Sequence, residues 1–207
     1  MYNYLDYTRC NEVINITYFC KNKMRKSVNL AKFDNSSFFR VGAGFFKRGS
    51  WFVCNGLFFK TPFHFYGVKV FLLRLFGAQI GSNVVIKPHV NIKFPWRLTI
   101  GDNVWIGEQV WIDNLDIVNI GNNVCISQGA FLLCGNHNYK KETFDLMVGS
   151  ITLEDGVWIG AKAMVCGNVI CHSHSILMVQ SVAVKNLDAY GIYRGNPAEK
   201  IKERVIE

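Results

Sequence analysis

The feature that most constrains the fold of this chain is an aliphatic or small residue that recurs at every sixth position. A second small or aliphatic residue stands two positions before each of them, from Ala78 to Ser181. The recurring residues are Ile80, Ile86, Ile92, Ile100, Ile106, Ile112, Ile120, Ile126, Leu132, Leu153, Ile159, Val165, Cys171, Leu177 and Ala183. This period indicates a parallel β-helix, in which each unit forms one short strand and a corner and three units close a triangular coil. Inward side chains stack from coil to coil, so no coil is stable alone.

The interruptions of the repeat predict where loops leave this β-helix. The spacing widens from six to eight residues twice and to twenty-one once, and each widening falls after a third unit. Because every third unit returns to the same corner, the segments 93–96, 113–116 and 133–152 are predicted to project one above another. The expected coils, about five in number, are 80–92, 100–112, 120–132, 153–165 and 171–183. Function on a regular scaffold is usually carried by such loops.

The longest interruption carries a histidine that is a candidate general base. His137 stands in the polar stretch CGNHNYKKETFD. Imidazole titrates near neutral pH and can take a proton from an acceptor hydroxyl that attacks an activated acyl group, if a partner holds its ring. Asp113, Asn114 and Glu108 are candidate partners, and the sequence does not choose among them. The competing interpretation is an ordinary solvated loop histidine.

Cysteine and histidine usage gives no sign of a disulfide or metal framework. The seven cysteines are odd in number and no C-x-x-C occurs, which favours reduced cytosolic thiols. Cys125 and Cys171 are expected to be small core residues. His172 and His174 are too few for a structural zinc site, so we expect no metal. The first residues resemble no signal peptide, and no apolar run reaches the ~18 residues that span a bilayer, so we expect a cytoplasmic protein.

An arm rich in basic and aromatic residues, 1–77, precedes the repeat. The window 35–101 contains no acidic residue. Its basic residues are Arg40, Lys47, Arg48, Lys60, Lys69, Arg74, Lys87, Lys93 and Arg97. This composition fits either peripheral contact with the inner membrane surface or another anionic ligand, or a packing arm whose lysines face water. Both interpretations stay open, because Gly49 and Gly56 weaken the expectation of a continuous helix. Without a recognition motif, nucleic acid is not expected.

The end of the chain, 188–207, is expected to close the core. The repeat stops at Ala183, and Pro197 can start a short helix rich in Lys and Glu. Such a helix would cap the open end of the solenoid, residues 78–187. The same end is locally basic, through Lys185, Arg194, Lys200 and Lys202. These charges serve either solubility or a phosphate-rich cofactor.

Several stretches resemble one family closely. From about Met24 to the end, the chain is similar to the left-handed β-helix acyltransferases. The stretches that carry this similarity are LLRLFGAQIGSNVVIKPHVNIKFPWRLTIGDNVWIG, ISQGAFLLCGNHNY, LEDGVWIGAKA and RGNPAEKIKER. Specifically it resembles the colanic acid biosynthesis acetyltransferase branch, with galactoside, maltose and nodulation acetyltransferases as wider relatives. The resemblance implies a left-handed parallel β-helix and a homotrimer with active sites between subunits. It also implies acetyl-CoA as donor and a carbohydrate hydroxyl, lipid-linked or free, as acceptor. Residues 1–23 match nothing in this family.

The resemblance also implies roles for individual residues. The family's catalytic histidine falls on His137, and its acceptor-side tryptophan falls on Trp158, with Asp113 and Asn114 as further acceptor-binding candidates. The cofactor-binding positions fall on Ala161, Val179, Val184, Lys185 and Lys202. The chain departs from the family at Met178–Gln180, where relatives carry Gly-Ala-Gly, and at Glu199, where they often carry Arg.

Two other functional classes compete with an O-acetyltransferase of cell-envelope or exopolysaccharide synthesis. The first is a non-catalytic trimeric scaffold or membrane-surface binding module, favoured by the bulky residues at Val179 and Gln180 and by the arm. The second is a β-helix carbonic anhydrase, which needs three zinc histidines at a subunit interface. Only His137 stands at a suitable corner, so the second class is disfavoured.

Overall fold

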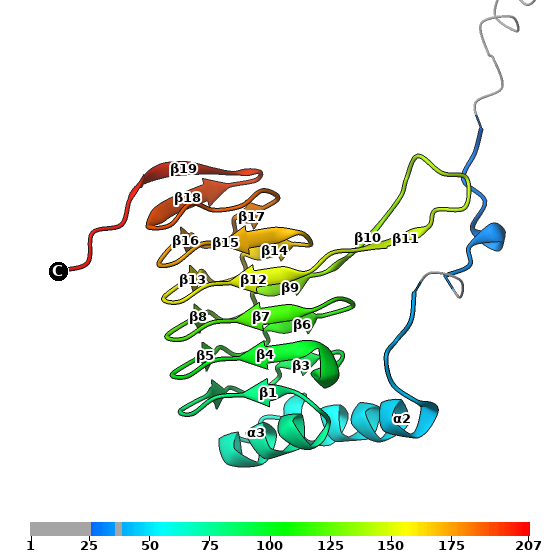
Figure 1. Cartoon of the computed structure of the whole chain (residues 1–207), viewed down its shortest axis with the longest axis horizontal. Helices are drawn as coiled ribbons and strands as arrows, with labels where there is room; N and C mark the ends of the chain where they lie inside the picture. Colours follow the sequence, from blue (N-terminus) through cyan, green and yellow to red (C-terminus); the bar gives the residue numbers. More distant parts are fainter. Residues whose placement is uncertain (1–25, 36–38) are drawn as a thin grey trace, which may run out of the picture. The chain divides into compact units, whose positions relative to one another are not determined.

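The computed structural model describes residues 26–35 and 39–207, which form two units (Figure 1). The expectation for residues 1–23 therefore lies outside the described residues. The smaller unit joins residues 26–34 to 138–145. It contains the short helix η1 (Leu30–Lys32), and the Lys32 ammonium lies 2.7 Å from the Glu142 carboxylate. The larger unit holds all other described elements.

The larger unit is a parallel β-helix with three sheets, as the repeat predicted (Figure 1). The first sheet contains β1 (Gln79–Ile80), β4 (Leu98–Ile100), β7 (Val118–Ile120), β12 (Ile151–Leu153) and β15 (Val169–Cys171). The second contains β2 (Val85–Ile86), β5 (Trp105–Ile106), β8 (Cys125–Ile126), β13 (Trp158–Ile159), β16 (Ile176–Leu177), β18 (Gly191–Gly195) and β19 (Ala198–Glu203). The third contains β3 (Asn91–Ile92), β6 (Trp111–Asp113), β9 (Phe131–Leu133), β14 (Met164–Cys166) and β17 (Val182–Ala183). The strands confirm the five predicted coils, and β18 begins a sixth.

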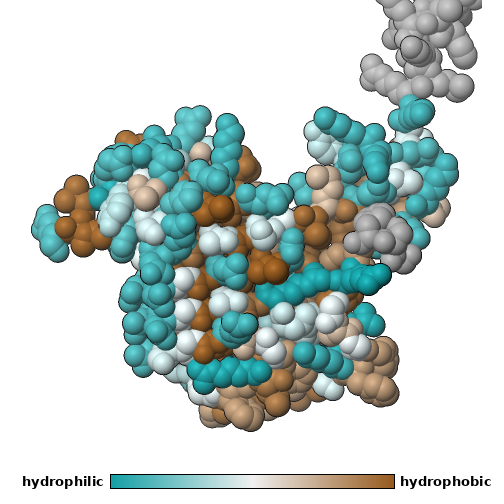
Figure 2. Space-filling view, in the orientation of Figure 1, coloured by the Kyte–Doolittle hydropathy of each residue, from teal (hydrophilic) through white to brown (hydrophobic). Residues whose placement is uncertain are grey.

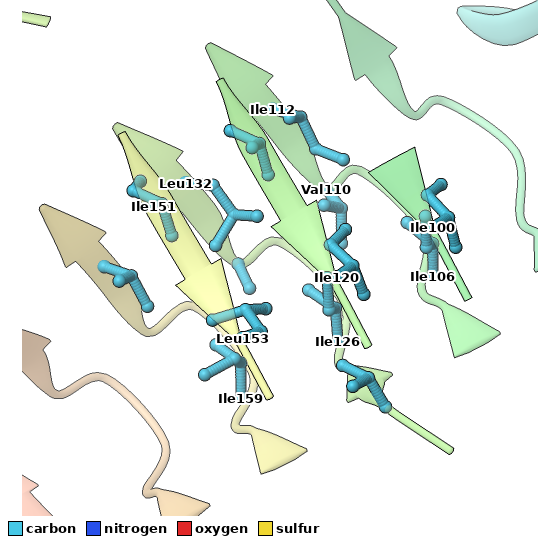
Figure 3. Close-up of a cluster of buried hydrophobic side chains, with 14 of the residues drawn as sticks. Ile100, Ile106, Val110, Ile112, Ile120, Ile126, Leu132, Ile151, Leu153 and Ile159 are labelled. Carbon is cyan, nitrogen blue, oxygen red and sulfur yellow. The ribbon is translucent and has the colours of Figure 1, made fainter. Parts of the chain in front are cut away.

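The core consists of the recurring residues, stacked in register. Ile100 pairs with Ile120, and Ile120 with Leu153, so side chains of one repeat position form a continuous column (Figure 3). Every predicted sixth-position residue from Ile86 to Ala183 is buried, whereas Ile80, the first of the series, is half-buried. Each coil therefore buries its apolar face only against its neighbours, which is why the fold needs closed ends.

The three interruptions leave the β-helix at one corner, between the third and first sheets, as predicted. Lys93 Nζ lies 2.8 Å from Asp113 Oδ1, one coil further on. Asn114 accepts from the Phe94 N–H at 2.9 Å and donates to the Phe94 carbonyl at 2.6 Å. The short helix η3 (Pro95–Arg97) completes the first interruption. The third begins and ends with an antiparallel pair, β10 (Gly135–His137) and β11 (Leu146–Val148).

A helical cap, residues 45–75, closes the first coil. It consists of α2 (Phe45–Cys54), which continues into the π-helix η2 (Asn55–Phe59), and α3 (Tyr66–Leu75). Some backbone groups of each coil bond to the next coil, as Lys87 N does to Ile106 O at 2.9 Å, and others bond to the preceding coil, as Gln109 N does to Pro88 O at 3.2 Å. The first coil has no preceding coil, so its carbonyls on that side need donors from elsewhere.

In each of the three sheets, one side chain of the cap donates a hydrogen bond to a carbonyl of the first coil. Arg74 donates to the Ile80 carbonyl of the first sheet at 2.8 Å. Lys69 donates to Ile86 O of the second at 3.2 Å, and Trp51 Nε1 to Ile92 O of the third at 2.9 Å. Burial lowers the pKa of Lys69 to about 8. This side of the arm is thus a packing surface, one of the two interpretations left open.

The predicted C-terminal helix is wrong: the chain from Pro197 forms β19, antiparallel to β18. In β18, Ile192 pairs with Ile176 of β16, and Leu187 forms a bridge with Cys171. The last coil offers an open sheet edge, and pairing with it outweighs the modest helical preference of Lys and Glu. The core is closed by a hairpin instead.

Candidate functional site

A groove of about 700 Å³ runs along the second sheet near the C-terminal end of the β-helix. Among the residues predicted from the sequence, Trp158, Ala161, Val179 and Lys202 line it. The other lining residues were not predicted as site residues, although Arg194 was noted in the basic end and Met178 as a departure from the family. They are Ser127, Gln128, Gly160, Ile176, Leu177, Met178, Ile192, Arg194 and Ile201. The groove is thus mostly apolar with a few convergent polar groups, the usual character of a ligand site.

Short contacts between coils fix the walls of this groove. Trp158, in β13, is 45% exposed and donates from Nε1 to Ser127 Oγ at 2.9 Å, which holds the indole in place. A Cβ on Gly160 would lie 2.5 Å from the Val179 backbone nitrogen, so only glycine lets these coils approach. Gln180 N donates to Ala161 O at 2.9 Å, which sets Val179 beside that corner.

Positive charge gathers at the C-terminal end of the groove. Arg194 lies on β18 and Lys202 on β19, so the hairpin that replaces the predicted helix still brings Lys202 to the groove. No Asp or Glu lines the groove among the described residues. Apolar walls that lead to two cations suit a ligand with an uncharged chain and an anionic end.

Val184 and Lys185 lie outside this groove. They follow β17, at the corner between the third and first sheets, and Val184 is 50% exposed. The His137 hairpin leaves the β-helix at this same corner. The predicted cofactor residues of one chain are therefore divided between two corners.

His137 ends β10, opposite Leu146 of β11. Its backbone N–H donates to Asn136 Oδ1 at 2.7 Å, and its side chain is half-buried. The Asp113 carboxylate lies at the base of this hairpin, because a Cβ on Gly135 would come within 3.6 Å of Asp113 Oδ2. Asp113 is buried and paired with Lys93.

The other two candidate partners of His137 are placed differently. Asn114 is fully buried, with both ends of its amide bonded to the Phe94 backbone, so it supports the loop 93–96. Its role in acceptor binding stays a prediction, and within one chain its amide is occupied by the Phe94 backbone. Glu108 is exposed at the corner between β5 and β6, across the β-helix from the His137 hairpin. Within one chain, Asp113 alone of the three lies at the base of that hairpin.

His172 and Cys171, outside this region, have ordinary structural environments. His172 Nδ1 lies 3.0 Å from Glu154 Oε1, and Ser173 and His172 hold the pKa of Glu154 below its usual range. Cys171 is buried in the core, and burial raises the pKa of its thiol to about 12. In the part of the chain that the structure describes, no group of three His, Cys, Asp or Glu side chains could hold a metal ion. No helix among those residues is long and apolar enough to cross a bilayer.

Sequence comparison finds clear relatives, although no protein-family model matches the chain. The chain is 36% identical over 177 residues to an Escherichia coli K12 protein named "Putative colanic acid biosynthesis acetyltransferase WcaF"; the alignment covers 86% of this chain and 97% of that protein. It is 24% identical over 135 residues to the galactoside O-acetyltransferase of Escherichia coli, covering 64% and 66% of the two chains.

Solved structures share the fold. A hexapeptide-repeat-containing acetyltransferase from Vibrio cholerae matches with a TM-score of 0.69 at 19% identity, over 76% of this chain and 90% of that one. A galactoside acetyltransferase in complex with coenzyme A matches with a TM-score of 0.68 at 20% identity, over 76% and 80%. These likenesses confirm the left-handed β-helix.

Proposed function

The chain belongs to the hexapeptide-repeat acetyltransferases, the family that includes WcaF, and from this premise we propose that it transfers an acetyl group from acetyl-CoA to a carbohydrate hydroxyl. The observation that carries the proposal is the groove with apolar walls and the cations of Arg194 and Lys202 at one end. Coenzyme A combines an uncharged pantetheine chain with phosphates and fits such a groove. A structural neighbour from Vibrio cholerae was solved in complex with acetyl coenzyme A.

In this proposal His137 is the general base. Its imidazole removes the proton of the acceptor hydroxyl, and the oxygen attacks the thioester carbonyl. The tetrahedral intermediate then collapses, the C–S bond breaks, and the imidazolium returns a proton to the leaving thiolate. Asp113, at the base of the hairpin, is the proposed partner that supports His137.

We further propose that the active protein is a homotrimer whose sites lie between subunits. The division of the predicted residues supports this. His137, Val184 and Lys185 lie at one corner of a chain, whereas Trp158 and Lys202 lie on the groove of the second sheet. A cyclic arrangement can join the corner of one subunit to the groove of the next. The carbohydrate acceptor then enters between them.

Replacement of His137 tests the chemistry. His137→Ala should lower the rate of sugar acetylation by ~10²–10⁴-fold while coenzyme A binding, measured by calorimetry, stays near wild type. His64→Ala is the matched control, because His64 is an exposed histidine of the cap. Wild-type acetylation by His137→Ala would rule out the base role. Failure of the wild-type protein to bind coenzyme A would favour a non-catalytic scaffold.

We also propose that the outer side of the cap contacts an anionic membrane surface from the cytoplasmic side. Phe45, Phe46 and Phe52 of α2 are 75%, 85% and 77% exposed. Other exposed apolar side chains of this region are Val53, Leu57, Phe63, Phe65, Val68, Phe71 and Leu75. Figure 2 shows this apolar surface over α2 and α3, at the bottom of the view. Soluble proteins rarely expose so large an apolar patch without a partner.

Charge supports a membrane as that partner. The window 35–101 contains no acidic residue, and Lys47, Arg48 and Lys60 lie on the cap or beside it. Basic residues beside apolar helices are attracted to anionic headgroups while the aromatic rings enter the interface. Such contact would bring the enzyme to a lipid-linked acceptor.

A further inference from the structure

We propose that a second groove, between the cap and the third sheet, binds a glycosyl phosphate, the sugar-phosphate part of the acceptor. This inference rests on the proposed acetyltransferase function and names its substrate class. The groove has a volume of about 260 Å³, enough for one sugar ring with its phosphate. Its lining residues are Arg48, Trp51, Phe52, Asn55, Lys60, Asn91, Lys93, Phe94, Trp96 and Trp111. It shares none of them with the groove of the second sheet.

Aromatic rings in fixed positions form the walls. Trp111 of β6 is 43% exposed and stacks on Phe131, with ring centroids 4.7 Å apart and an angle of 12° between the planes. Trp96 is held by a 2.8 Å hydrogen bond from Nε1 to Val41 O and stacks on Phe94. Rigid, half-exposed indoles offer flat apolar surface at low entropic cost, which suits the C–H face of a sugar ring.

Cations without acidic partners stand in the same groove. Arg48 and Lys60 form no ion pair with any residue in the described parts of the chain, and Lys93 is paired with Asp113. No Asp or Glu lines this groove among those residues. A guanidinium and an ammonium without acidic partners that line one groove favour a phosphate ester, whose oxygens accept several charge-assisted hydrogen bonds.

An unsatisfied amide in the wall is the observation that most strongly indicates a ligand. Asn55 is 7% exposed and donates from Nδ2 to Asn91 Oδ1 at 2.8 Å. The side-chain oxygen of Asn55, Oδ1, is buried and has no hydrogen-bond partner in the described structure. A buried acceptor without a donor is costly, and a ligand hydroxyl would relieve that cost. Sugar hydroxyls supply such donors, whereas a fully ionised phosphate does not.

Together these groups define the ligand chemistry. The aromatic walls fit the sugar ring, the amides of Asn55 and Asn91 fit its hydroxyls, and Arg48 and Lys60 fit the phosphate. Phe52 lines the groove and is 77% exposed, so it continues into the apolar surface of the cap. A lipid attached to the phosphate could follow that surface, while a free sugar phosphate would use the groove alone.

Calorimetric titrations with glucose 1-phosphate, glucose and inorganic phosphate test the assignment. We expect glucose 1-phosphate to bind more tightly than either fragment, and Arg48→Gln/Lys60→Gln to weaken it by at least about tenfold. Trp111→Ala should weaken glucose 1-phosphate but leave inorganic phosphate unchanged. Arg40→Gln, which removes an exposed arginine outside the groove, should leave all three unchanged.

Two results would overturn the assignment: equal affinity for inorganic phosphate and glucose 1-phosphate, or unchanged binding in the double variant. Coenzyme A titrated in parallel keeps the proposed function separate, because its affinity should not respond to Arg48→Gln/Lys60→Gln. Far-UV circular dichroism confirms that each variant is folded. A glycosyl phosphate with a short isoprenyl chain that binds more tightly than glucose 1-phosphate identifies the lipid-linked source, and equal affinities identify the free one.

Discussion

The single buried amide of Asn114 bonds the corner that carries the His137 hairpin to the coil before it. Asn114 satisfies both the N–H and the carbonyl of Phe94, and neighbouring Asp113 pairs with Lys93. The sequence could predict that these residues stand beneath His137, because the phase of the repeat fixes which corners coincide. It could not predict that Asn114 faces inward, because the loops 93–96 and 113–116 have no periodic pattern.

Removal of this amide should weaken the fold measurably. Asn114→Ala leaves the buried N–H and carbonyl of Phe94 without their partner, and we expect a loss of about 1–3 kcal/mol in the free energy of unfolding. Asn119→Ala is the matched control, because Asn119 is exposed on β7. Urea denaturation of both variants measures the difference. Equal midpoints for the two variants would show that the Phe94 bonds contribute little.

At the scale of elements, the sequence predicted the strands where burial is periodic, was wrong about the C-terminal helix and left the N-terminal arm open. Every strand of the five coils follows from the six-residue period, since each strand buries the same side chains. The segment 198–203 contains good helix formers, but it forms a strand because it pairs with β18, which itself pairs with β16. The cap is helical despite Gly49 and Gly56, because Trp51 and Lys69 anchor it to the first coil.

The outer side of the cap predicts salt-sensitive membrane binding. The full-length protein should sediment with vesicles that contain anionic phosphatidylglycerol and be released as ionic strength rises, since screening weakens the basic contacts. Phe45→Ser/Phe46→Ser should reduce the bound fraction several-fold, because each substitution removes an aromatic ring that would bury apolar area in the membrane interface. Tyr139→Ser, at another exposed aromatic residue, is the control.

Unchanged sedimentation of the Phe45/Phe46 variant would exclude the cap as the contact surface. A fall in oligomer size of that variant by light scattering, without loss of vesicle binding, would assign the patch to contacts between copies of this chain instead.

At the scale of the whole molecule, the proposed division of the site between two corners would make activity a property of the trimer. His137→Ala and Trp158→Ala subunits should each be poorly active alone. Coexpressed, they should form mixed trimers in which one site in three combines an intact His137 with an intact Trp158. Acetylation assays on purified mixed trimers measure this recovery. Activity no higher than that of the single variants would place the whole site within one chain.

Each coil pairs with the next one in parallel, so the bare first and last coils of two molecules would be complementary. The cap covers the first of these ends, where Arg74, Lys69 and Trp51 donate to carbonyls of the first coil. A chain that begins at Ala78 would expose it, and head-to-tail stacking that never closes should then build filaments, visible as rising light scattering. The β-helix could otherwise be extended indefinitely by stacking, and the cap limits it to a finite length.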